Sequence, residues 1–379
     1  MAYFLLSFIL MYSSIHFYLY FKIRSAFHPN AAATLCITIA FILLGLAPLI
    51  VRITESYGFE TTARFSAYIG YIWMGIIVLF FFTSLILDVY RFFAYAAGYV
   101  AKADMAAFRL SPLYAFMIPF IMALGVTVYG YFEARHIRTE TIVIRTPKLP
   151  PEAGKLRIVQ ISDIHIGLMI KEKRLSKILA EVKKADPDII VSTGDLLDGE
   201  INNLAKPLEM LKNINPRYGK YAVTGNHEFF AGIQNAVEFT EGAGFKLLRG
   251  EGVTVAGLIN IAGIDDSTGR NIFYPRRVPE KDILEKLPRE HFTLLLKHRP
   301  VVNPDAPGHF DLQLSGHTHK GQFFPFSIIT NLFFPYHAGY YELPKGSSLY
   351  VSRGSGTWGP PIRFLSPPEI TVIDLITER

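Results

Sequence analysis

Five short polar clusters, each at the end of an apolar run, carry residue types that could build a hydrolytic metal site. They occupy residues 158–167, 192–195, 224–228, 296–300 and 315–321. Together they supply aspartates, an asparagine and several histidines, which are ligands that borderline divalent cations accept. Because the carboxyl ends of strands can gather distant residues into one crevice, these side chains are expected to meet. The pattern predicts a metal-dependent hydrolase.

The first two clusters contribute carboxylates. Asp163 and His165 are two residues apart after a predicted strand, so their side chains can point the same way, although an isolated Asp-x-His is also common in turns. Asp195 ends another predicted strand, where its carboxylate could bridge two cations or cap a helix. Asp198 is interpreted as a cap or hydrogen-bond acceptor rather than a ligand.

The later clusters contribute an amide and imidazoles. Asn226 offers a neutral carbonyl oxygen, and His227 beside it could donate a proton or stabilise charge. His298 follows a predicted strand, so it could face the same crevice or be an ordinary buried histidine. His317 and His319 repeat the alternating spacing of the first pair. The single cysteine excludes a zinc-finger set.

The elements that must position these clusters alternate in the first half of the globular region. Apolar runs predict strands at 156–161, 188–192 and 220–223, and helical spacing predicts helices at 171–184, 202–214 and 232–242. Further strands are predicted at 257–264, 292–297, 312–315, 348–352 and 370–375. The early βαβα order favours a parallel sheet, and the later part is rich in strands. A two-sheet core with helices on its outer faces accommodates both.

The first third of the chain has a different composition. Four stretches without charged residues predict transmembrane helices at about 2–21, 31–51, 66–87 and 113–132, each near the 20 residues that span a bilayer. The domain prediction is therefore a membrane domain over 1–133, a linker over 134–154 and a globular domain over 155–379. Basic residues in the first and third loops favour an extracytoplasmic globular domain, although Arg135 and Arg138 argue the other way.

The net charge of +6 suits anionic lipid headgroups or anionic substrates, and no basic stripe with interleaved aromatics predicts nucleic-acid binding. A transporter or channel is disfavoured because the predicted spans hold no charged residue. The oligomeric state is not predicted by the sequence.

The order Asp-x-His, Gly-Asp-x-x-Asp, Gly-Asn-His-Glu, a later His and Gly-His-x-His resembles the calcineurin-like metallophosphoesterase superfamily, over roughly residues 155–379. The Lys-His-Arg-Pro segment at 297–300, the segment from Gly316 to Gln322 and the Tyr-Val-Ser-Arg-Gly ending at 350–354 resemble its membrane-associated bacterial branch. The resemblance implies a four-layer αββα sandwich and an integral protein of the bacterial inner membrane. It also implies a first metal held by Asp163, His165 and His319, and a second held by Asn226, His298 and His317, with Asp195 bridging and His227 catalytic without being a ligand.

The activity implied by this resemblance is hydrolysis of a phosphomonoester, phosphodiester or pyrophosphate bond. Two divalent cations (manganese, zinc, iron or magnesium) about 3.5–4 Å apart would clamp the phosphoryl oxygen and activate a water for in-line attack. A lipid-linked substrate is favoured because membrane anchoring raises its local concentration. The alternative is a non-catalytic membrane sensor or scaffold that uses the same fold to bind a ligand.

Two basic residues and one aromatic stretch have open interpretations. Lys320 stands where the resembling branch commonly has glycine, so it is either a surface lysine or a contact to a substrate phosphate or headgroup. Arg353 is a second candidate substrate contact. The stretch 323–341 is dense in aromatic residues. It could pack in the core, enter the membrane interface or line a groove for acyl chains.

Overall fold

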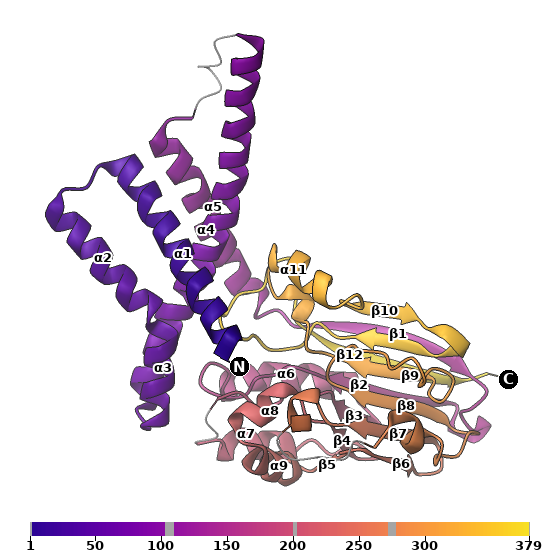
Figure 1. Ribbon diagram of the computed structural model, residues 1–379. Helices are drawn as coiled ribbons and strands as arrows, with labels where there is room; N and C mark the ends of the chain where they lie inside the picture. The colour runs from indigo at the N-terminus through magenta and orange to yellow at the C-terminus, as the bar shows by residue number, and fades with distance from the viewer. Residues whose placement is uncertain (1, 103–109, 200–202, 272–277, 379) are drawn as a thin grey trace. The chain divides into compact units, whose positions relative to one another are not determined.

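The structure is a computed structural model that describes residues 2–102, 110–199, 203–271 and 278–378 (Figure 1). The chain divides into two compact units. One comprises Met1–Phe132 with Gly359–Ile362, and the other comprises Glu133–Trp358 with Arg363–Arg379.

The first unit is built from apolar helices. They are α1 (Ala2–Phe27), α2 (Ala31–Gly45), α3 (Ala47–Ser56), α4 (Glu60–Ala101) and α5 (Pro112–Glu133). Among the described residues, α1, α4 and α5 are each long and apolar enough to cross a membrane. A fourth span is counted only if α2 and α3, which meet at an angle of 49°, are taken together.

The break between α2 and α3 corrects the expectation of one continuous helix over 31–51. Pro48 stands in the first turn of α3. A proline has no backbone N–H to donate to the preceding turn, and its ring clashes with that turn, so α2 ends at Gly45. Helix α4 is also longer than expected and extends on both sides of residues 66–87.

The second unit holds two six-stranded sheets. The first has the order β1 (Arg138–Thr146), β12 (Glu369–Thr377), β2 (Lys155–Ile161), β3 (Ile189–Ser192), β4 (Lys220–Ala222) and β5 (Phe245–Leu247). The second has the order β10 (Gly339–Glu342), β11 (Ser348–Val351), β9 (Leu312–Ser315), β8 (Phe292–Lys297), β7 (Ile259–Ile264) and β6 (Glu251–Val255). Strands β2 to β5 are parallel to one another, as are β7, β8, β9 and β11.

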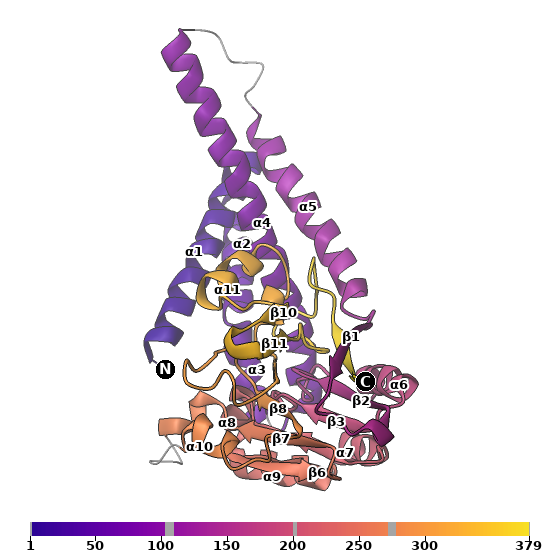
Figure 2. The same ribbon diagram turned by 90° about the vertical axis from the view of Figure 1, so that its right-hand side faces the viewer.

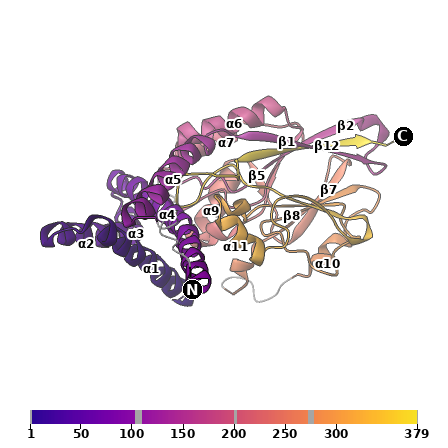
Figure 3. The same cartoon turned by 90° about the horizontal axis from the view of Figure 1, so that it is seen from above.

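Helices cover the outer faces of the two sheets (Figure 3). Helices α6 (Glu172–Ala185), α7 (Ala205–Lys212) and α9 (Ile233–Gly242) share an apolar cluster with the first sheet. Helix α10 (Glu280–Leu284) packs on the outer face of the second sheet. Helices α8 (Asn226–Ala231) and α11 (Phe326–Phe333) and four 3-10 turns (151–153, 267–271, 319–321 and 344–346) complete the unit. The layers are those of the expected αββα sandwich.

The inner faces of the sheets bury a second large apolar cluster between them. Ile158 of β2, Leu294 of β8 and Leu312 of β9 are each fully buried there. Burial of one such side chain contributes about 1.5–3 kcal/mol. The sandwich is therefore a rigid support for the loops at its edge.

Residues 138–146 form β1, although the stretch 134–154 was expected to be a linker. This strand pairs in parallel with β12 along its whole length, from Arg138 opposite Glu369 to Thr146 opposite Thr377. Its side chains alternate between exposed and half-buried positions. The expectation was wrong here because the nearby charges and prolines outweighed a run of β-branched residues that suits a strand.

Candidate metal centre

The predicted ligands lie at strand ends, as the parallel topology requires. Asp163 and His165 follow β2, and Asp195 follows β3. Asn226 opens α8 just after β4, His298 follows β8, and His317 and His319 follow β9. The first sheet thus supplies one half of the site and the second sheet the other.

The backbone at several of these positions is strained. Asp163, His165, Asp195, His317 and His319 all have a positive φ, between 49° and 71°. A non-glycine residue in this left-handed region is destabilised by about 1–3 kcal/mol, and such residues concentrate at functional sites. The surrounding sandwich therefore holds five candidate ligands in conformations they would not adopt on their own.

Glu228 organises two of these loops, a role that the sequence interpretation missed. Its buried carboxylate accepts hydrogen bonds from the backbone N–H groups of Leu196 (2.7 Å) and Leu197 (3.1 Å) through one oxygen. Its other oxygen accepts from Asp195 (3.0 Å) and Gly225 (2.6 Å). The signal was present as the last residue of the Gly-Asn-His-Glu motif.

Gly225 allows the two loops to approach each other. A β-carbon at this position would overlap the carboxylate and the backbone nitrogen of Asp195. Only glycine avoids that overlap. The conformation also places the His227 N–H 2.8 Å from Asp195 Oδ1, to which it donates.

Asp163, His165 and His319 form the first cluster of potential ligands. One ligand atom from each lies within 4.8 Å of the others, and all three residues are buried. The Nε2 atoms of His165 and His319 are 3.1 Å apart, and His319 Nε2 is 3.5 Å from Asp163 Oδ1. Ser162 and the backbone N–H of His317 donate to the Asp163 carboxylate and fix its orientation.

Asp195, His298 and His317 form the second cluster, again within 4.8 Å of one another. His298 Nε2 lies 3.1 Å from Asp195 Oδ2, 3.1 Å from His317 Nδ1 and 3.2 Å from Asn226 Oδ1. The other nitrogen of His298 is 2.9 Å from the carbonyl of Thr193, which orients the ring. Asp195 also lies 3.9 Å from His165, so it stands between the two clusters.

The chemistry of these donors fits divalent cations. Two imidazole nitrogens 3.1 Å apart, as in both histidine pairs, need a proton or a cation between their lone pairs. Burial, followed by neighbouring positive charge, lowers the pKa of His165 to about 4 and that of His317 to about 3. These rings are therefore neutral at pH 7, which is the form that binds metal.

His298 has the opposite shift, for a reason that points to the same site. Burial lowers its pKa, but the carboxylates of Asp195, Asp163 and Asp266 together outweigh burial and raise the pKa to about 10. A proton on His298 Nε2 then faces Asp195, Asn226 and His317 together. A positive charge is thus favoured at the point where the potential ligand atoms of these three residues meet His298 Nε2.

His227 lies beside both clusters, and one of its ring nitrogens already has a hydrogen-bond partner. Its Nδ1 is 2.7 Å from Asp198 Oδ1, so Asp198 is a hydrogen-bond partner as expected. Burial lowers the pKa of His227, but the carboxylates of Asp195 and Asp198 outweigh burial and raise it to about 9. The rings of Phe230 and Trp358 each lie 5.7 Å from the His227 ring.

Comparison with known proteins adds to this geometry. The family model described as calcineurin-like phosphoesterase matches residues 156–321. An uncharacterized metallophosphoesterase of Aquifex aeolicus is 38% identical over 67% of this chain and 97% of its own length. The chain belongs to the calcineurin-like phosphoesterase family. A Helicobacter pylori metallophosphoesterase is 34% identical over 79% of this chain and 81% of its own length.

A relative named as a transmembrane protein is also among these matches. A transmembrane protein with metallophosphoesterase domain from Danio rerio is 32% identical over 68% of this chain. The chain spans 62% of the length of that relative. Related phosphoesterases therefore occur in bacteria and in a vertebrate.

Arg363 is a second residue that the sequence interpretation missed in this phosphoesterase. Its guanidinium is fully buried and donates to the carbonyls of Gly356 and Arg353. It also lies 2.9 Å from His319 Nδ1 and donates to the His319 carbonyl. Arg363 follows two prolines in an irregular segment, so no periodicity in the sequence marked it.

Lys320 and Arg353, the predicted substrate contacts, line one cavity of about 260 Å³, whose lining includes none of the candidate metal ligands. Arg353 is ion-paired with Glu140 and Glu369, which line the same cavity. Lys320 directly follows His319 in the 3-10 turn and also has a positive φ. The side chains of Lys320 and Arg353 thus differ, because the carboxylates of Glu140 and Glu369 hold Arg353 in place.

Proposed function

We propose that this chain is a membrane-anchored phosphoesterase that hydrolyses a phosphoester bond with two divalent cations. The observation that carries the proposal is the convergence of two buried His and Asp clusters that share the region around Asp195. Asp163, His165 and His319 would hold one cation, and Asn226, His298 and His317 the other, with Asp195 between them. Manganese, zinc, iron and magnesium are the candidate ions.

Such a pair of cations supplies Lewis acidity, which neutralises the phosphoryl oxygens and makes a water nucleophilic at neutral pH. The protein itself provides the buried and fixed donor set, so little reorganisation is needed during the reaction. A positively charged side chain next to the candidate ligands would aid binding of the substrate phosphate. We assign the phosphate contact to Lys320, because Arg353 is engaged by two carboxylates.

His227 is proposed to handle the proton of the leaving group. Its Nδ1 is occupied by Asp198, which leaves Nε2 to face the substrate. The two carboxylates that raise its pKa keep the ring protonated at pH 7, so it can donate a proton to the departing oxygen. Asp198 acts by orienting this ring and stabilising its charge.

The membrane proposal rests on the apolar helices and on the charge distribution between them. The described residues contain three or four helices that could span a bilayer. The basic residues Lys22 and Arg24 near the end of α1, and Arg91 and Lys102 toward the end of α4, favour the cytoplasmic side for those helix ends and hence an extracytoplasmic catalytic unit. We propose a bacterial inner membrane. Protease accessibility of the C-terminal unit in intact cells tests this orientation. A substrate that is itself a membrane lipid would be concentrated by such anchoring.

The test is a hydrolysis screen with the purified full-length chain in detergent. Soluble nucleotides and lipid phosphomonoesters, phosphodiesters and pyrophosphates are offered with each candidate ion. His227→Ala should lower kcat by roughly 10²–10⁴ with the bound metal unchanged. His291→Ala, which changes a histidine outside both clusters, is the matched control. Equal turnover in wild type and His227→Ala would instead favour a ligand-binding scaffold.

A further inference from the structure

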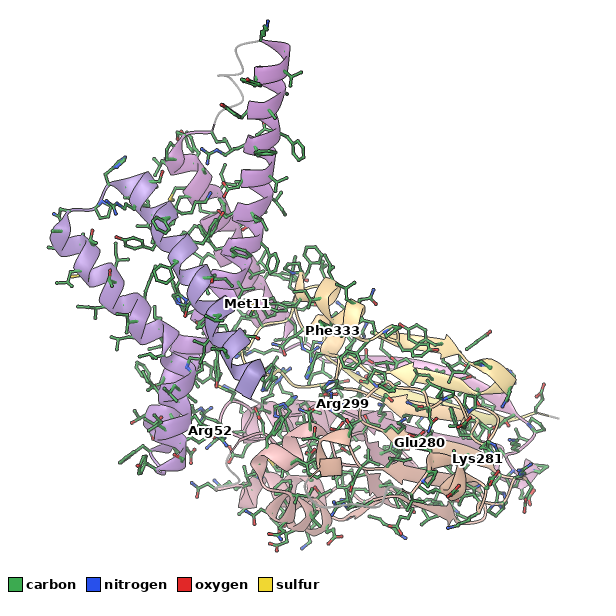
Figure 4. The ribbon with its side chains drawn as sticks, in the orientation of Figure 1. Met11, Arg52, Glu280, Lys281, Arg299 and Phe333 are labelled. Carbon is green, nitrogen blue, oxygen red and sulfur yellow. The ribbon has the colours of Figure 1, made fainter. Side chains whose placement is uncertain are left out.

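Helix α11 is an apolar helix that the globular unit does not bury. None of its residues is buried, and Leu332 and Phe333 are 79% and 75% exposed. Ile328 and Ile329 of the same helix, and Phe324 just before it, are exposed as well. Figure 4 labels Phe333 on this helix. Exposed apolar residues gathered on one short element usually mark an interaction surface.

Helix α11 packs directly against the candidate metal centre. It packs against the 3-10 turn that carries His319, where a β-carbon at Gly321 would overlap the backbone of Ser327. Just after the helix, the Phe334 ring lies 5.1 Å from the ring of His317. In Figure 2, α11 lies beside β10 and β11. A partner bound to α11 would therefore stand next to the candidate ligands.

The chain connectivity limits what that partner can be. Helix α5 ends at Glu133 and β1 begins at Arg138, so four residues join a candidate membrane span to the first sheet. Four extended residues reach at most about 14 Å. If α5 crosses a bilayer, as the proposed function holds, the globular unit stays at the level of the lipid headgroups. A bilayer is then always within reach of this unit, whereas a second copy would have to be recruited.

The charge of the segment also suits a bilayer. No aspartate or glutamate occurs between Lys320 and Tyr341, and Lys320 itself is basic. Insertion of this segment therefore buries no carboxylate, and the lysine matches anionic headgroups. Two exposed aromatic residues, Phe230 and Trp358, contact His227 from other elements and add apolar surface near the site.

We propose that α11 inserts its apolar side chains into the headgroup and upper acyl region of the bilayer that anchors the chain. The inserted helix holds the mouth of the metal centre against the membrane surface, so that a phosphate on a lipid headgroup reaches the ligands without leaving the bilayer. This inference rests on the proposed function for the anchoring of the chain. It names the membrane surface as the source of the substrate.

The experiment measures the depth of α11 in the full-length chain. The single cysteine is removed by Cys36→Ser, and Leu332→Cys is labelled with an environment-sensitive fluorophore. The protein is reconstituted in vesicles of phosphatidylcholine and phosphatidylglycerol that contain lipids brominated on the acyl chain. Lys184→Cys, at a side chain that is 80% exposed on α6, is the matched control label. We expect bromolipid to quench the label at position 332 at least threefold more than the label at position 184.

A second variant tests whether the apolar side chains cause the insertion. Leu332→Ser combined with Phe333→Ser should reduce the quenching of a label at Ile328→Cys at least threefold. Val143→Ser, which changes an exposed valine on β1, should leave that quenching unchanged. Because both altered side chains are exposed, these substitutions leave the core intact.

Equal quenching at positions 332 and 184 would overturn the inference. A second result would also overturn it: a label at position 332 that is shielded from water but not quenched by bromolipid, together with cross-linking between two copies of the chain through that position. Turnover of para-nitrophenyl phosphate is followed in the same samples. Strong quenching without turnover of this probe or of any substrate in the hydrolysis screen would refute the proposed function and leave the insertion standing, so the two failures are distinguishable.

Discussion

Replacement of Glu228 by glutamine should destabilise the folded conformation of the loops that carry Asp195 and Asn226. The Glu228 carboxylate accepts four backbone N–H groups, two on each oxygen. A glutamine keeps one acceptor oxygen, but its amide NH₂ would face the other two N–H donors. The substitution changes one atom and leaves the volume of the side chain nearly unchanged.

The magnitude follows from the number of bonds lost. Burial raises the pKa of Glu228 to about 7, so its carboxylate is charged above that pH. There a hydrogen bond to the charged group contributes about 1.5–3 kcal/mol, so two such bonds amount to about 3–6 kcal/mol. In a unit of this size, each kcal/mol lowers Tm by about 2–4 °C. The variant should therefore unfold at least about 6 °C below the wild type. Because the Asp195 carboxylate would be displaced, the Glu228→Gln protein should also hold less metal than the wild type.

The assay is calorimetry of the full-length protein in detergent, with the metal content of the same sample measured by elemental analysis. Glu238→Gln is the matched control, because Glu238 is exposed on α9. A Glu228→Gln protein with the Tm and metal content of the wild type would refute this account of the loops. A fall in Tm for both variants would point to a general effect of losing an acidic side chain.

Three further outcomes are expected. Asp195→Asn should remove most of the bound metal, as elemental analysis would show, and chelation should lower the Tm of the wild type more than that of the variant. Arg363→Met should lower Tm and weaken metal retention, measured in the same way, because several buried carbonyls, including that of His319, lose their donor. Burial lowers the pKa of Lys220 from 10.5 to about 8, so the folded chain binds fewer protons than the unfolded chain between these values. The stability contributed by Lys220 therefore rises across that window, and the Tm of wild type minus that of Lys220→Met, measured by calorimetry, should rise with it.

The convergence of the candidate ligands could be predicted from the sequence because it follows from topology. Asp163, Asp195 and Asn226 follow three neighbouring parallel strands, and His298 and His317 follow two parallel strands of the facing sheet. The carboxyl ends of such strands share an edge, so a polar residue just after each strand lies in one crevice. The apolar runs that mark these strands are strong local signals.

Features that depend on tertiary contacts were not predictable in the same way. Arg363 is fully buried among backbone carbonyls from several loops, and its own neighbours in sequence give no sign of this. Strand β1 pairs with a partner more than 200 residues away. The break before α3 was marked by Pro48, but the apolar composition around it favoured one continuous span.

The pairing of β1 with β12 has a consequence for biosynthesis. The first strand made after the apolar helices waits for almost the last residues of the chain, because Thr146 is opposite Thr377. Until β12 has left the ribosome, one edge of β2 lacks this neighbour, and β1 lacks the strand with which it pairs. Unpaired strand edges promote aggregation, so the nascent chain needs protection during this interval. Deletion of β12 would prolong that state indefinitely.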